Sequence, residues 1–132
     1  MFAFALWDGR AQTLTLARDP MGIKPLFLWR SREGRLAFAS ELKAFLGLEG
    51  FEARPDFRSL GQYLEFAFVP DLERTSLEGV RKLPPGHVLT VSADDVATGR
   101  TPRPGAYFAA PRAERSAEGK WSFDARADRL FE

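Results

Sequence analysis

The chain has 132 residues, of which 45% are hydrophobic, including 12 Phe and 3 Trp. This composition can form one globular, soluble domain with a hydrophobic core. The 19 basic and 18 acidic side chains leave a net charge of +1, which gives no electrostatic reason to expect nucleic acid or an anionic membrane as a partner. Cysteine is absent, which excludes a thiolate nucleophile, a zinc–cysteine site and a disulfide within this chain.

The first apolar run, Phe2 to Trp7, ends at Asp8-Gly9 and predicts a strand. Apolar residues occupy both of its faces, with Phe2, Phe4 and Leu6 on one of them, so we expect both faces to be covered. The run is too short to span a membrane, and it lacks the preceding basic region of a signal peptide. A cytoplasmic location is therefore expected.

The next segment, Thr13 to Asp19, alternates in the manner of a half-buried strand. Asp19-Pro20-Met21-Gly22 then predicts a tight turn, since Pro presets φ and Gly22 tolerates a left-handed backbone. We expect this turn to close a β-hairpin with the strand at Leu26 to Trp29. A further turn at Arg32-Glu33-Gly34 leads to a strand at Leu36 to Ala39, so that the four strands predict an antiparallel meander.

Two helices are predicted after these strands. Ser40 is expected to cap the first, with Leu42, Phe45 and Leu46 on one face and Gly47 at its end. Asp56 is expected to cap the second, whose apolar stripe is predicted to lie in the core and consists of Phe57, Leu60, Tyr63 and Leu64.

Two strands, Val80 to Leu83 and Val88 to Val91, are predicted on either side of the Pro85-Gly86 turn, and residues 93–99 are predicted to form a loop. His87 is the only histidine, and with no nucleophile beside it a structural role is expected. From residue 100 to residue 122 the composition is typical of an interdomain linker. Solvated linker charge is the expected role of its arginines, Arg100, Arg103, Arg112 and Arg115. A short helix capped by Ser122 or Asp124 is predicted to follow.

Four stretches resemble the glutaminase domain of glutamine-dependent asparagine synthetases, which are class II amidotransferases with an N-terminal-nucleophile fold. They are MFAFALWD (Met1 to Asp8), LARDPMGIKPLF (Leu16 to Phe27), LAFASELKAFL (Leu36 to Leu46) and VRKLPPGHVL (Val80 to Leu89). The resemblance implies an α+β fold, part of an αββα sandwich with an antiparallel meander packed against helices. It assigns residues 1–99 to the C-terminal half of the amidotransferase domain, 100–122 to the linker and 123–132 to the start of a truncated synthetase domain.

The resemblance also implies a reaction. The parent enzyme hydrolyses glutamine through a cysteine thioester and uses the ammonia to convert aspartate, activated by ATP and Mg²⁺, into asparagine, with AMP and pyrophosphate released. What looks like the first half of the glutaminase domain, with its cysteine and glutamine-binding groups, has no counterpart in this chain, and neither does the glycine-rich pyrophosphate loop of the synthetase domain. We therefore expect no catalytic residue, cofactor site or metal site here, and no activity from the isolated chain.

Five motif residues are expected to have a structural or interface role: Arg18, Asp19, Gly22, Ser40 and Glu41. Arg18 and Asp19 are predicted to pair with each other or across the turn. The missing half of the glutaminase domain and the synthetase domain are the expected partners, and a homodimer of the parent is left open. Two alternatives also stay open. One is another class II amidotransferase, such as a β-lactam synthetase or a sugar or nucleotide amidotransferase, and the other is a non-catalytic binding module.

Overall fold

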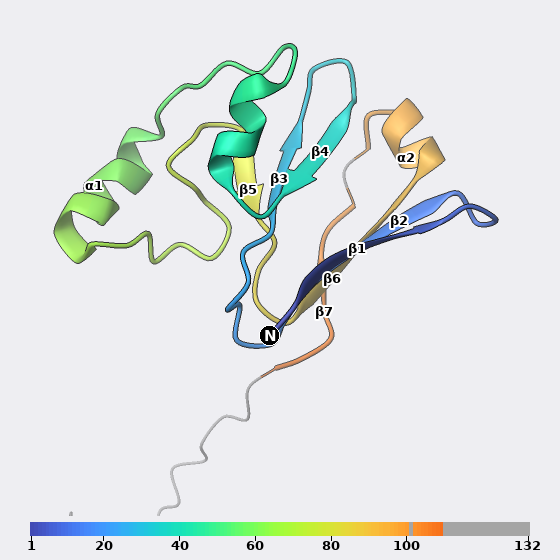
Figure 1. Ribbon diagram of the computed structural model, residues 1–132, viewed down its shortest axis with the longest axis horizontal. Helices are drawn as coiled ribbons and strands as arrows, with labels where there is room; N and C mark the ends of the chain where they lie inside the picture. Colours follow the sequence, from blue (N-terminus) through green and yellow to red (C-terminus); the bar gives the residue numbers. More distant parts are fainter. Residues whose placement is uncertain (101, 110–132) are drawn as a thin grey trace, which may run out of the picture.

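The computed structural model describes residues 1–100 and 102–109 (Figure 1). Within these residues the strands form two antiparallel sheets, one in the order β1-β2-β6-β7 and the other in the order β4-β3-β5. The first sheet contains β1 (Ala3–Asp8), β2 (Thr13–Arg18), β6 (His87–Ser92) and β7 (Gly105–Ala106). The second contains β3 (Phe27–Arg30), β4 (Leu36–Ala39) and β5 (Val80–Lys82). The expected α+β class is confirmed.

The predicted single meander is wrong, because β2 and β3 belong to different sheets. β1 pairs with β2, and β3 pairs with β4, so the chain forms two separate hairpins. The turn at Asp19 exists, with the N–H of Gly22 donating to the carbonyl of Asp19 at 3.0 Å. The residues after this turn carry the chain from one sheet to the other instead of closing a hairpin. β5 and β6 are likewise in different sheets, and the Pro85-Gly86 turn lies on the return crossing.

The core lies between the two sheets. Its buried residues come from the four-stranded sheet and from the crossing segments, namely Leu16, Leu26, Leu83, Leu89 and Val91. Leu28 and Leu36 of the three-stranded sheet pack against this cluster from the other side. Side-chain alternation on β2 and β6 therefore turns one face of the four-stranded sheet toward the core.

β1 lies at an edge of its sheet and is far more exposed than its sequence suggests. Phe4 is 47% exposed, Leu6 61% and Trp7 53%. Among the described residues nothing covers this apolar strand on both faces, contrary to expectation. Such an edge, apolar and unpaired on one side, is prone to association with other chains.

The first predicted helix is a short 3₁₀ helix, η1 (Leu42–Gly47), and the predicted Ser40 cap is wrong. Glu41 is the residue before its first turn, and it makes no side-chain capping hydrogen bond. The tighter 3₁₀ winding brings residues i and i+3 onto one face. Phe45 is accordingly buried, while Leu46 turns outward and is 58% exposed.

The second helix, α1 (Phe57–Phe66), has the predicted cap but not the predicted environment. The carboxylate of Asp56 accepts a hydrogen bond from the backbone N–H of Ser59 at 3.1 Å. Figure 1 shows α1 beside the three-stranded sheet, on the side away from the four-stranded sheet. Most of its apolar stripe therefore lies outside the core, with Phe57 77% and Leu64 85% exposed.

Residues 93–99 are not wholly a loop, because a short helix, α2 (Ala93–Ala97), begins after β6. Ser92 and Asp95 form a capping box, in which each side chain accepts from the backbone N–H of the other. The Ser-x-x-Asp spacing is the sequence signal for this cap. Arg100 forms an ion pair with the same aspartate, so its charge is not simply solvated.

His87 begins β6, and its Nδ1 donates to the carbonyl of Pro85 at 2.7 Å. The predicted linker contributes β7, which pairs with β6. Residues 110–132 lie outside the described residues, and with them Arg112, Arg115, the helix predicted after Ser122 and the synthetase segment at 123–132.

We predict that Leu16→Ala lowers the free energy of unfolding by about 3 kcal/mol, because a fully buried leucine leaves a cavity between the sheets. Leu6→Ala, on the paired strand but exposed, is the matched control and should cost less than about 1 kcal/mol. Urea unfolding followed by tryptophan fluorescence measures both values. Equal losses for the two variants would contradict the placement of the core.

Candidate functional site

The loop after β2 is organised around the carboxylate of Asp19, a residue that is only 2% exposed. Its Oδ1 accepts hydrogen bonds from the backbone N–H groups of Met21 and Ile23, both at 3.1 Å. Its Oδ2 accepts from the N–H of Lys24 at 3.0 Å and from that of Phe2 at 3.3 Å. One side chain thus satisfies the backbone donors of its own turn and of the segment that precedes β1.

These contacts also decide the charge of Asp19. Burial by itself would raise the pKa of the carboxyl group, because it disfavours the charged form. The hydrogen bonds from the four backbone N–H groups act in the opposite direction and prevail, lowering the pKa to about 2. Asp19 is therefore ionised at neutral pH and accepts hydrogen bonds without donating one.

The neighbouring Arg18, 8% exposed, binds three backbone carbonyls. Its guanidinium donates to the carbonyl oxygens of Gly22 at 2.7 Å, Leu83 at 2.8 Å and Lys24 at 2.9 Å. Burial lowers the pKa of Arg18, and the nearby charge of Asp19 opposes that shift. The hydrogen bonds of both side chains thus go to backbone groups, with Arg18 reaching across to the other crossing of the chain.

Gly22 is required at the centre of this loop by its geometry. Its φ is +65°, and a Cβ at this position would lie 2.7 Å from Cγ of Pro85. The guanidinium carbon of Arg18 would lie 3.2 Å from the same Cβ. A side chain would therefore push the loop away from both neighbours.

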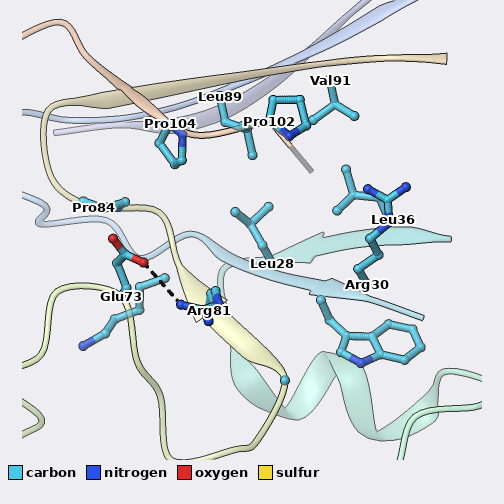
Figure 2. Close-up of a pocket in the computed structure, with 13 residues that line it drawn as sticks. Leu28, Arg30, Leu36, Glu73, Arg81, Pro84, Leu89, Val91, Pro102 and Pro104 are labelled. Atoms are coloured by element: carbon cyan, nitrogen blue, oxygen red, sulfur yellow. Dashed lines mark hydrogen bonds and ion pairs between the residues drawn. The ribbon is translucent and has the colours of Figure 1, made fainter. Parts of the chain in front are cut away.

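A pocket of about 200 Å³ opens between the two sheets. Figure 2 shows Leu28 and Leu36 reaching into it from the three-stranded sheet, with Leu89 and Val91 reaching toward them from β6. Pro102 and Pro104 also line it, and Glu73 is paired with Arg81 at 3.3 Å on its border. The lining is mainly aliphatic. Its charged residues are Arg30, Glu73, Arg81 and Lys82, so that the border carries a net positive charge beside the Glu73–Arg81 pair.

Among residues 1–100 and 102–109, no three His, Cys, Asp or Glu side chains are grouped so as to hold a metal ion. A search of the same residues finds no helix with the length and apolar character needed to cross a membrane.

Comparison with known proteins identifies the family. Residues 1–101 match the glutamine amidotransferase domain family. The chain belongs to this family. A putative glutamine-hydrolysing asparagine synthetase of Mycobacterium tuberculosis is 45% identical over 100 residues, which are 74% of this chain and 15% of the relative.

Two further relatives of the amidotransferase chain are informative. Glutamine-hydrolysing asparagine synthetase 1 of Bacillus subtilis is 37% identical over 102 residues, 76% of this chain and 16% of the relative. Amidase chyE of Penicillium rubens is 38% identical over 90 residues, 67% of this chain and 12% of the relative. The chain thus spans about one sixth or less of the length of these relatives. The resemblance to the asparagine synthetase glutaminase domain is confirmed.

The five motif residues of the amidotransferase chain do not form one cluster. Arg18 ends β2, and Asp19 and Gly22 lie in the turn that follows it, whereas Ser40 and Glu41 lie between β4 of the other sheet and η1. Ser40 is exposed, and the carboxylate of Glu41 is paired with Lys43 at 2.6 Å, on the surface.

Sequence reasoning missed the partners of the Arg18–Asp19 loop. Leu83 and Gly86 hydrogen-bond to it, although they are more than 60 residues away in the chain. The LPPGH stretch predicted a turn, and nothing in its local pattern indicates which loop it packs against. The Tyr107 contact described below was missed for the same reason.

The charge of Asp19 predicts a loss of stability in acid. A carboxyl group whose pKa is about 2 when folded and near 3.8 when unfolded stabilises the folded state fully above about pH 4. This stabilisation is lost as the pH falls toward 2. We predict that Asp19→Asn unfolds at lower urea concentration than the wild type at pH 6, and that the two midpoints converge toward pH 2.5.

Urea titrations at several pH values measure this convergence. Glu65→Gln, which neutralises an exposed carboxylate on α1, is the control and should change the stability at pH 6 by less than about 0.5 kcal/mol. A difference between wild type and Asp19→Asn that stays constant from pH 6 to pH 2.5 would show that the Asp19 charge does not stabilise the fold.

Proposed function

We propose that this chain forms part of the glutamine-hydrolysing domain of an asparagine synthetase and supplies the framework of that domain rather than its catalytic groups. The main support for this proposal is the set of hydrogen bonds that Arg18 and Asp19 make to backbone groups of their loop. This loop is the most specific motif of the resemblance, and both charged side chains bind backbone groups. Side chains held in this way position loops and are not free to attack or protonate a substrate.

The proposed first reaction takes place in the whole protein. A cysteine thiol attacks the side-chain amide of glutamine, ammonia leaves, and water hydrolyses the resulting thioester to glutamate. Backbone or side-chain donors must also stabilise the oxyanion that forms in each of these steps. The chain has no cysteine, so under this proposal the nucleophile and its oxyanion donors come from another part of the protein.

The proposed second reaction uses the ammonia to convert aspartate, activated by ATP, into asparagine, with AMP and pyrophosphate as the other products. The chain matches only 15% of the length of the M. tuberculosis relative. The sites for ATP, Mg²⁺ and aspartate are proposed to lie in a synthetase domain outside this chain. A cytoplasmic location of the whole enzyme stays a prediction.

A second candidate is an amidotransferase that acts on a different acceptor. Its support is the similarity to amidase chyE, which covers 67% of this chain. The framework role of the chain would be the same in either enzyme, because the acceptor is chosen elsewhere. The exposed apolar edge at β1 argues against an independent binding module, since such a module would leave this edge open to association.

We predict that the purified chain releases no glutamate from glutamine above a boiled control, because it carries no thiol nucleophile. Glutamate and ammonia are measured over several hours at high protein concentration. Glutamine-dependent glutamate release that is removed by boiling would contradict the framework role.

A chimaera tests the function positively. Residues 1–109 replace the matching stretch of B. subtilis asparagine synthetase 1, and asparagine formation is measured with either glutamine or ammonia as the nitrogen source. We predict that both activities persist. Loss of the glutamine-dependent activity alone, with ammonia-dependent synthesis intact, would show that this chain does not serve as a glutaminase framework, because the synthetase part would still be folded and active.

A further inference from the structure

The segment after α2 returns to the Arg18–Asp19 loop through Tyr107. The phenol O–H of Tyr107 donates to the backbone carbonyl of Arg18 at 2.7 Å. This contact joins residues 89 positions apart in the chain. It lies at the end of β2, next to the carboxylate that organises the loop.

A second set of hydrogen bonds runs through Gly86. Its N–H donates to the carbonyl of Asp19 at 3.0 Å, so that the Pro85-Gly86 turn is bound to the loop. Its carbonyl accepts from the N–H groups of Tyr107 at 2.9 Å and Phe108 at 3.2 Å. Gly86 therefore lies between the loop and residues 105–108, the outgoing segment, and binds both.

The packing at Gly86 is close. Its φ is +67°, and a Cβ here would lie 2.9 Å from the backbone oxygen of Phe108. On the adjacent strand, His87 faces Ala106 and Val88 faces Gly105. The outgoing segment is thus held in one register against β6 by a two-residue strand, one glycine and one phenol group.

Burial alone does not explain this arrangement. Tyr107 is 47% exposed and Phe108 41% exposed, so neither ring is a core side chain. A strand of two residues makes few ladder hydrogen bonds, so the position of β7 depends mainly on the contacts of Tyr107 and Phe108 with Gly86 and of Tyr107 with Arg18. The phenol group is protonated at neutral pH and can donate. Its partial burial and the charge of Asp19 raise the pKa of Tyr107 further above the ordinary value.

We propose that Tyr107 is a positioning residue that fixes the outgoing segment to the Arg18–Asp19 loop, so that the chain leaves the amidotransferase framework from one fixed place. This inference rests on the proposed function, in which ammonia made in one domain is consumed in the next. Under this proposal, a fixed position of the outgoing segment keeps glutamine hydrolysis coupled to the use of ammonia in asparagine synthesis. If the outgoing segment is released, we expect ammonia to escape, so that glutamine is hydrolysed without asparagine being formed.

The chimaera tests this role through the ratio of asparagine formed to glutamate released. Tyr107→Phe removes only the hydroxyl group, and we expect this ratio to fall by up to about five-fold, the limit set by the loss of one net hydrogen bond of about 1 kcal/mol. Ammonia-dependent synthesis should be unchanged. Tyr63→Phe, which removes the hydroxyl of an exposed tyrosine on α1, is the matched control and should leave the ratio unchanged.

An unchanged ratio in Tyr107→Phe would overturn the positioning role, and so would an equal loss of glutamine- and ammonia-dependent synthesis. If the unsubstituted chimaera has no glutamine-dependent activity, the proposed function fails. Hydrogen exchange measured on the original chain then tests separately whether the outgoing segment is bound to Gly86. The amides of Tyr107 and Phe108 should be protected together with that of Gly86. Free exchange at residues 107 and 108, with residues 86–92 protected, would overturn the proposal without any substitution.

Discussion

The fold depends on the contact between its two crossing segments. One segment carries the chain from β2 to β3, and the other carries it from β5 to β6, so each leaves one sheet and enters the other. The guanidinium of Arg18 reaches the carbonyl of Leu83, while the carbonyl of Asp19 accepts from Gly86. The two sheets are therefore joined by hydrogen bonds at the same end at which their chains cross, and the aliphatic core fills the space beyond.

This junction explains why charged residues occur at buried positions. Backbone groups in a crossing segment have no ladder partners, and leaving them unpaired away from water is costly. Asp19 accepts from the donors, and Arg18 donates to the acceptors. Two opposite charges next to each other in the chain thus satisfy several backbone groups of one irregular loop, and each is itself satisfied by several hydrogen bonds rather than by one ion pair.

Local patterns in the sequence predicted local structure well. The strands, the Asp19 turn, the Asp56 cap and the family were all accessible, because each depends on residues near one another or on an ordered set of motifs. The sequence could not show that β2 and β3 belong to different sheets, since an Asp-Pro-x-Gly turn has the same form in a hairpin as in a crossing between sheets. The apolar stripe of α1 predicted burial in the core, which is wrong for most of its residues. A stripe of this kind cannot indicate whether a covering surface lies within the described residues. Ser92 and Asp95 carried a readable capping signal that the loop-like composition around them obscured.

The strand order has a kinetic consequence. β1–β2 and β3–β4 are local hairpins and can form within microseconds. β6 joins β2 only when residues such as Thr13 and Ser92 meet, which requires closure of a loop containing most of the described chain. Pairings of such high contact order are slow, because the entropy of closure is lost before the contacts form. During synthesis, β2 therefore remains open on one side until β6 has left the ribosome, and the β1–β2 hairpin has two unpaired edges in that interval.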